Sequence, residues 1–165
     1  VKSYIVKAGT IIFLSSMVIW FLMNFGMYEG SFGLLDPEMD DYIQYSLMAG
    51  LGNLLAWIFM PLGFGDWRAS TALVTGLLAK ESVISTFAVL LGTESASALS
   101  GLFTPLTAYV FLVFTLLYPP CVAAIGAVKG ELGPKWAAAV FALQCVVAWV
   151  VALAVRLAGM VLGLA

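Results

Sequence analysis

Two charged side chains stand in the middle of an otherwise apolar stretch of this sequence. Lys80 and Glu81 are the only charged residues between positions 69 and 92. A charged group at the centre of a membrane helix costs ~2.5–3.5 kcal/mol, so such groups face a protein interior or a water-filled cavity. Glu81 therefore has two open interpretations: an ion pair that fixes helix packing, or a place on an ion path.

Helical geometry separates these two neighbours. Residues four apart share a helix face, which places Ser85 with Glu81, whereas Lys80 lies ~100° around the helix. We expect Glu81 and Ser85 to face the interior of the helix bundle. We expect Lys80 to find a separate polar partner or to reach water, because an unpaired ammonium in lipid is costly.

A second candidate is the run Pro119-Pro120-Cys121. Neither proline has an N–H group, so the carbonyl oxygens of Thr115 and Leu116 lose their usual helical partners. The run predicts a helix that breaks near the middle of the membrane, with free carbonyl oxygens beside a thiol. Discontinuous helices of this kind build ion sites in transporters, and a proline kink that serves only packing is the alternative.

The two cysteines differ in context. When deprotonated, Cys121 is a soft ligand that suits a transition metal, and the freed carbonyl oxygens stand beside it. Cys145 has only apolar neighbours in the sequence, which predicts buried packing. The sequence contains no histidine, which excludes His-based zinc sites, the two-His iron triad and His-held haem.

Composition sets the class of protein. Hydrophobic residues make up 63% of the 165 positions and charged residues 10%, and the mean hydropathy is +1.08. Apolar stretches long enough to span a bilayer cover residues 8–26, 101–128 and 136–155, and residues 69–92 apart from their two central charges. We expect an all-α, polytopic bundle of transmembrane helices with four or five spans in the lipid bilayer, one helix being broken at Pro119-Pro120.

Short polar segments connect the expected helices. The first helix covers residues 4–28, and the acidic connection 29–41 follows it without a basic residue. This connection is either a solvated loop or a vestibule that concentrates cations. Residues 47–64 are interrupted by glycine and proline, so they form a tilted span, a re-entrant segment or an interfacial helix. The last helix covers residues 136–162, with Arg156 reaching toward the interface.

The length leaves no room for a soluble domain of ordinary size, because each span uses ~20 residues. We expect residues 1–165 to form one membrane domain. The sequence starts at Val1 without a signal peptide, which we interpret as a piece of a longer polypeptide or a processed chain. No P-loop motif occurs, so no GTP site is expected in this chain. A net charge of −2 disfavours nucleic acid as a partner.

Three stretches, read together, resemble the ferrous iron transporter B family, FeoB. They are K-A-G-T-I-I at 7–12, P-L-G-F-G-D-W-R at 61–68 continuing to T-G-L-L-A-K-E-S-V at 75–83, and L-L-Y-P-P-C-V-A at 116–123. Their order and approximate spacing are similar to the C-terminal half of that family's membrane region, including its second gate-type segment. The resemblance extends over nearly the whole chain.

The resemblance implies that ferrous iron is a transported substrate and that this multi-pass chain lies in a bacterial cytoplasmic membrane. Family members carry a G-protein domain and an earlier gate-type half, neither of which is in this sequence. These parts would be partners of the chain, and small accessory proteins or further copies of the chain are other candidates. GTP hydrolysis would belong to the G domain, so we do not expect this chain to be an enzyme.

The resemblance also points to individual residues. The family's Pro-Cys pair, thought to line its iron path, maps onto Pro120 and Cys121, and Glu81 matches the acidic position of its A-K-E motif. We take Cys121 and Glu81 as candidate ligands of a transient ferrous site. The supporting positions are Ser85, Thr115, Leu116, Pro119 and Pro120.

Other functions stay open at this point. Gate-type helices also occur in nucleoside permeases, whose sites should offer amide and aromatic groups, and Gln144 is the only amide well inside an expected span. A non-transporting assembly subunit, whose Lys80 and Glu81 bind another chain, is a further alternative. An intramembrane enzyme is disfavoured, because no nucleophile and base stand at a recognisable spacing.

Overall fold

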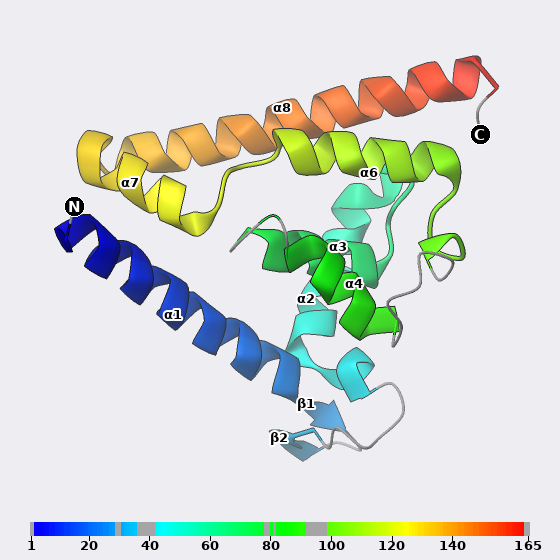
Figure 1. Ribbon diagram of the computed structural model, residues 1–165. Helices are drawn as coiled ribbons and strands as arrows, with labels where there is room; N and C mark the ends of the chain where they lie inside the picture. Colours follow the sequence, from blue (N-terminus) through cyan, green and yellow to red (C-terminus); the bar gives the residue numbers. More distant parts are fainter. Residues whose placement is uncertain are drawn as a thin grey trace.

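The computed structural model describes residues 2–28, 31–35, 42–77, 80, 82–91 and 99–163. It is dominated by helices (Figure 1), which confirms the all-α membrane class. The α-helices are α1 (Lys2–Asn24), α2 (Leu47–Phe59), α3 (Trp67–Gly76), α4 (Ser82–Leu91), α6 (Pro105–Leu117), α7 (Val122–Leu132) and α8 (Pro134–Val161). Two 3-10 helices, η1 (Tyr42–Tyr45) and η2 (Met60–Leu62), and two strands, β1 (Phe25–Tyr28) and β2 (Ser31–Leu34), complete the described elements.

The longest helix, α8, lies alongside both α6 and α7, as Figure 1 shows. On the other side of α6 lie α2, α3 and α4, where α3 packs against both of its sequence neighbours. Helix α1 contacts α7 and α2. Helix α6 therefore lies between α8 and the short helices, and α7 lies between α8 and α1.

The described residues contain two helical segments that are long and apolar enough to cross a membrane, Pro105–Leu132 and Pro134–Val161. A third is added when Leu47–Leu62 and Trp67–Gly76, which are bent by 102°, count as one broken or re-entrant span. Phe13–Asn24 and Ser82–Leu91 are shorter apolar helices. The predicted four or five spans exceed the number found within the described residues.

The first helix ends earlier than predicted. It stops at Asn24, whose side-chain Nδ2 donates to the carbonyl oxygen of Trp20 at 2.8 Å. Strand β1 follows and pairs with β2 in an antiparallel hairpin. The prediction of helix to residue 28 and a loop from residue 29 was therefore wrong, because the aromatic residues that flank Glu29-Gly30 favour strands. Residues 29, 30 and 36–41 of the acidic connection lie outside the described part.

Residues 47–64 fold into a short helix followed by a turn. Helix α2 begins at its N-cap Ser46, whose Oγ accepts a hydrogen bond from the Ala49 N–H at 3.1 Å. It ends through η2 at Gly63, which has a φ of 90°, a conformation that favours glycine. Asp66 then caps α3, accepting from the Arg68 N–H at 2.7 Å. The segment is thus the first arm of a sharply bent helix pair.

The predicted continuous helix over residues 69–92 is also wrong. It is divided into α3 and α4, which lie side by side (Figure 1). The hydroxyl oxygens of Thr75 and Thr86, one on each helix, are hydrogen-bonded at 2.7 Å. Buried polar side chains of this kind hold two apolar helices in one register, because each hydroxyl needs a partner. Residues 78, 79 and 81 of the division lie outside the described part.

Aromatic rings fill the centre of the molecule. Phe64 contacts Phe59, Phe111 and Phe114 with centroid distances of 5.5, 5.3 and 6.0 Å. Phe87 on α4 contacts Phe111 at 5.6 Å. Such ring pairs add ~0.5–1.5 kcal/mol each beyond the burial of their area. The cluster therefore fixes α6 against the bent pair and α4.

Helix α8 holds the far end of α2 through two side chains. Trp149 donates from Nε1 to the carbonyl oxygen of Ile58 at 3.1 Å. Arg156 donates from Nη1 to the carbonyl oxygens of Met60, at 3.3 Å, and Pro61. The last carbonyl groups of a helix have no partner within the helix, so α8 supplies it. The position of Arg156 at the membrane interface stays a prediction, and these carbonyl oxygens are its partners in the structure.

A Trp149→Phe substitution tests this bracing. It keeps an aromatic ring but removes the indole N–H, and we expect a loss of about 0.5–1.5 kcal/mol in unfolding free energy. The measurement is thermal unfolding in detergent micelles. Trp136→Phe is the control, because Trp136 is 63% exposed on the same helix. Equal unfolding temperatures for the two variants would contradict the role of Trp149.

Candidate functional site

The helix break predicted at the two prolines is confirmed. The last helical hydrogen bond of α6 runs from the Tyr118 N–H to the carbonyl oxygen of Phe114 at 2.8 Å. Helix α7 starts only at Val122, and Pro119 between them is fully buried. Helices of 13 and 11 residues flank the break, so it lies near the middle of the helical segment. Its depth in the membrane stays a prediction.

Lys80 reaches this break from the other broken helix. Its Nζ donates to the carbonyl oxygen of Leu116 at 3.1 Å and to that of Tyr118 at 3.5 Å. The ammonium also lies 5.1 Å from the centre of the Tyr118 ring. The Leu116 oxygen would normally accept from the residue four positions later, which is a proline without an N–H. The prediction of a separate polar partner for Lys80 is confirmed.

A main-chain hydrogen bond joins the same two breaks. The Val122 N–H donates to the carbonyl oxygen of Leu77 at 2.8 Å. The first N–H groups and last carbonyl groups of helices lack partners inside their own helix. Here the start of α7 and the end of α3 satisfy each other, so the two interruptions are held together. We call this meeting point, residues 77–80 with residues 116–122, the junction; residues 78 and 79 are outside the described part.

Close packing fixes Tyr118 in the junction. Its ring stacks on Phe114 with a centroid distance of 5.8 Å, and 5% of its surface is exposed. A Cβ atom added to Gly76 would lie 2.5 Å from the Tyr118 hydroxyl and would also overlap Val83. The absence of a side chain at Gly76 therefore allows α3, α4 and the broken helix to approach one another.

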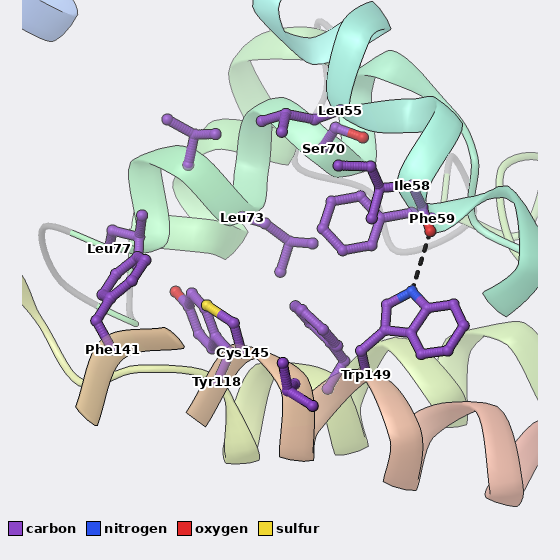
Figure 2. A pocket seen from close by; sticks show the side chains of 13 residues that line it. Leu55, Ile58, Phe59, Ser70, Leu73, Leu77, Tyr118, Phe141, Cys145 and Trp149 are labelled. Carbon is purple, nitrogen blue, oxygen red and sulfur yellow. Dashed lines mark hydrogen bonds between the residues drawn. The ribbon is translucent and has the colours of Figure 1, made fainter. Parts of the chain in front are cut away.

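Beside the junction lies an apolar cavity of about 440 Å³. Its lining side chains come from α2, α3, α6, α8 and the residues that follow α3 and α6, and Figure 2 shows the labelled ones around the cavity. The lining residues are Leu55, Ile58, Phe59, Ser70, Leu73, Val74, Leu77, Phe114, Tyr118, Phe141, Cys145, Val146 and Trp149. Cys145, which the sequence predicts to be buried, is half-buried on this wall. Among the described residues, the buried Tyr118 hydroxyl has no hydrogen-bond partner.

The predicted ligands have different positions. Cys121 is half-buried in the junction as the N-cap residue of α7, and its carbonyl oxygen accepts from the N–H groups of Ala124 and Ile125. Glu81 lies outside the described residues, between Lys80 and Ser82, which are described. Within the part of the chain that the structure describes, no three His, Cys, Asp or Glu side chains form a group that could hold a metal ion.

The expected position of Ser85 is wrong. It lies on the exposed side of α4 together with Ile84, whereas Val83 and Thr86 are buried. The extrapolation of one helix through residue 81 placed Ser85 on the interior face. Because α3 and α4 are separate helices, that face is set by the start of α4 and not by the preceding turn.

Sequence reasoning missed the role of Tyr118 and Leu77. The signal for Tyr118 was present, since an aromatic residue before two prolines stands at a fixed break and beside freed carbonyl groups. Leu77 has no such signal, because it acts through its main-chain oxygen, which every residue possesses.

The fold and the junction can now be compared with known proteins. Residues 5–135 match the family model described as Gate, nucleoside recognition, and the chain belongs to this family. The chain is also 38% identical over 164 residues to the Fe(2+) transporter FeoB of Methanocaldococcus jannaschii, covering 96% of this chain and 24% of that protein. The resemblance to FeoB that the motifs indicated is confirmed.

Two further relatives agree. FeoB of Staphylococcus aureus strain COL is 38% identical over 153 residues, which is 90% of this chain and 22% of that protein. FeoB of Campylobacter jejuni is 36% identical over 161 residues, which is 92% of this chain and 26% of that protein. The chain thus spans about a quarter of the length of these relatives. No solved structure matches the chain significantly.

A Gly76→Ala substitution tests the close approach at the junction. We expect it to lower the unfolding free energy by about 1–3 kcal/mol, because the new methyl group must displace Tyr118 and the stiff side chain of Val83. Gly130→Ala is the matched control, since nothing lies within 4 Å of its added Cβ on α7. That variant should be neutral or slightly more stable. Thermal unfolding in detergent compares the two, and a harmless Gly76→Ala would contradict the packing described.

Proposed function

We propose that this chain is part of the permease of a ferrous iron transporter and that the ion passes the junction. One observation carries the proposal: two broken helices meet there, with main-chain oxygens and Cys121 at the same point. Interrupted helices at membrane depth are tolerated where they are buried in protein or line a water-filled cavity. The choice of ferrous iron as the ion rests on the names of the FeoB relatives. The placement in a membrane rests on the long apolar helices.

The donor set suits transient binding. Cys121 offers a thiolate, Glu81 a carboxylate, and the broken helix offers carbonyl oxygens. Ferrous iron accepts sulfur and oxygen ligands. A closed cage of four cysteines would hold the metal, whereas conduction requires a site weak enough to release it. We propose Cys121 as the first ligand and Glu81 as the second, supported by the carbonyl oxygens of Thr115 and Leu116.

The surrounding organisation follows from the same proposal. Residues 1–165 form one membrane domain, and the remaining permease half and a G domain are partners elsewhere in the transporter. GTP hydrolysis belongs to that G domain, and this chain contributes passage of the ion. The membrane is the bacterial cytoplasmic membrane, and ferrous iron is the substrate.

The cavity argues against a nucleoside as the substrate. A nucleoside carries several hydrogen-bonding groups, and each needs a partner when buried. Apart from the indole N–H of Trp149, which is bound to Ile58, the polar side-chain groups on the cavity wall are the hydroxyls of Ser70 and Tyr118 and the thiol of Cys145. We therefore take the family description as evidence for the fold and not for a nucleoside substrate. The FeoB relatives and the junction favour a metal ion as the substrate.

Uptake of labelled ferrous iron tests the path. We expect Cys121→Ala, Cys121→Ser and Glu81→Gln each to lower uptake ~10-fold or more, because a lost ligand weakens metal binding by at least that factor. The protein is expressed from its complete coding sequence at matched membrane abundance. Cys145→Ala and Glu131→Gln are the controls and should retain uptake, since Glu131 is exposed on α7.

If uptake is lost in Glu81→Gln but retained in both Cys121 variants, Cys121 is a packing residue and not a ligand. Full uptake in both Cys121→Ala and Glu81→Gln would end the proposal for the junction, and residues 29–41 would then be examined in the same way.

The pH dependence of uptake offers a separate check on the thiolate. Protons compete with the metal for a thiolate, so metal binding weakens as the pH falls. We expect the wild type to lose uptake on acidification more steeply than Cys121→Ser, measured as the ratio to its own uptake at neutral pH. Parallel profiles would show that no thiolate takes part.

A further inference from the structure

The ammonium group of Lys80 already occupies the oxygen-lined part of the junction. Two main-chain oxygens, from Leu116 and Tyr118, accept from its Nζ, and the Tyr118 ring lies 5.1 Å away. Carbonyl oxygens and the face of an aromatic ring both attract cations, and neither can bind an anion. These three contacts therefore define a cation site that the chain fills with its own charge.

The site exists because of covalent structure and not because of Lys80. Pro120 has no N–H, so the Leu116 oxygen is free of its helical partner whichever side chain is nearby. Tyr118, at the C-cap of α6, has an extended conformation, with φ −66° and ψ 166°, that carries its carbonyl out of the helix. Removing Lys80 would leave both carbonyl oxygens without the ammonium that now donates to them.

The ammonium also has room to leave. Lys80 lines a groove of about 740 Å³ between α4 and α6, together with Ile84, Phe87, Ala108 and Leu112 among others. Its side chain is half-buried and has four rotatable carbon–carbon bonds, so the charged end can swing out while the stem stays on apolar surface.

We propose that Lys80 is a tethered cation that holds the junction between transport events and that an entering divalent ion must displace it. This inference rests on the proposed function, since it names what competes with the transported ion. A cation that does not bind sulfur gains only the contacts with the carbonyl oxygens that the ammonium leaves. Ferrous iron gains the thiolate of Cys121 in addition, so Lys80 favours ions that bind sulfur.

Iron uptake kinetics provide the first measurement, with protein expressed from its complete coding sequence. Lys80→Met removes the charge and keeps most of the stem, and we expect its KM for ferrous iron to fall roughly tenfold, as for the loss of one competing charge-assisted hydrogen bond. Lys80→Arg keeps a cation and should retain a KM near the wild-type value. Lys129→Met is the control, because Lys129 is exposed on α7.

Chemical labelling of Lys80 provides the second measurement and does not depend on uptake. Purified protein is treated anaerobically with an amine-acetylating reagent, with and without ferrous ion, and acetylation of each lysine is quantified by mass spectrometry. We expect ferrous ion to increase labelling of Lys80 and to leave Lys129 unchanged. Magnesium ion, which does not favour sulfur, should have a much smaller effect.

The outcomes separate this inference from the proposed function. If wild type imports iron but ferrous ion leaves Lys80 labelling unchanged, the tethered cation is refuted while transport stands. Lys80→Met could instead leave KM unchanged and lower maximal uptake, with Lys80→Arg restoring uptake. That result would assign Lys80 a purely structural role and would also refute the tethered cation. If wild type imports no iron, labelling alone decides: increased labelling supports a displaceable Lys80, and unchanged labelling overturns it.

Discussion

Every polar group of the main chain needs a partner inside a membrane, and this requirement organises the whole molecule. An uninterrupted helix meets it internally, but in this chain helices end at Phe59, Gly76 and Leu117. Each unpaired group in an apolar environment costs several kcal/mol. Where the structure describes them, groups left at these interruptions are satisfied from another helix. Arg156 and Trp149 serve the first interruption, while Lys80 and a main-chain hydrogen bond connect the other two.

Packing then makes these connections geometrically possible. A main-chain hydrogen bond of 2.8 Å between Val122 and Leu77 requires two backbones to approach closely. Gly76 permits that approach, and the stacked rings of Phe114 and Tyr118 fill the space beside it. The polar junction is therefore enclosed by apolar and aromatic groups. A low local dielectric strengthens each hydrogen bond there and raises the cost of losing one.

The sequence predicts those features that covalent structure determines locally. The break at Pro119-Pro120 was predictable because proline lacks an N–H, and so was the freeing of the Leu116 oxygen. The partner of Lys80 was predictable in kind, as some polar group, because an ammonium cannot remain unpaired in lipid. The identity of that partner was not, since it depends on how two helices 36 residues apart in the chain pack together.

The errors have one common cause. Residues 69–92 contain no proline and read as one apolar helix, yet the chain divides there because Thr75, Thr86 and the junction contacts satisfy the separated ends. Such compensation comes from tertiary structure and leaves no periodic signal in the sequence. The partners of Arg156 were equally unpredictable, because its acceptors are carbonyl oxygens of η2, far from it in the sequence. The position of Ser85 followed wrongly from the same assumption of a continuous helix.

Charge balance gives the tethered cation a physical rationale within the proposed function. In the proposed resting state, the formal positive charge of Lys80 balances the formal negative charge of Glu81, its neighbour in the sequence. In the proposed loaded state, Glu81 and the thiolate of Cys121 balance the doubly charged ferrous ion, while Lys80 lies in the groove. Both states keep the junction close to neutral, whereas a divalent ion added to an intact Lys80 contact would leave excess positive charge in a low dielectric. The exchange therefore replaces one neutral arrangement by another, which is what a site that must bind and release its ion requires.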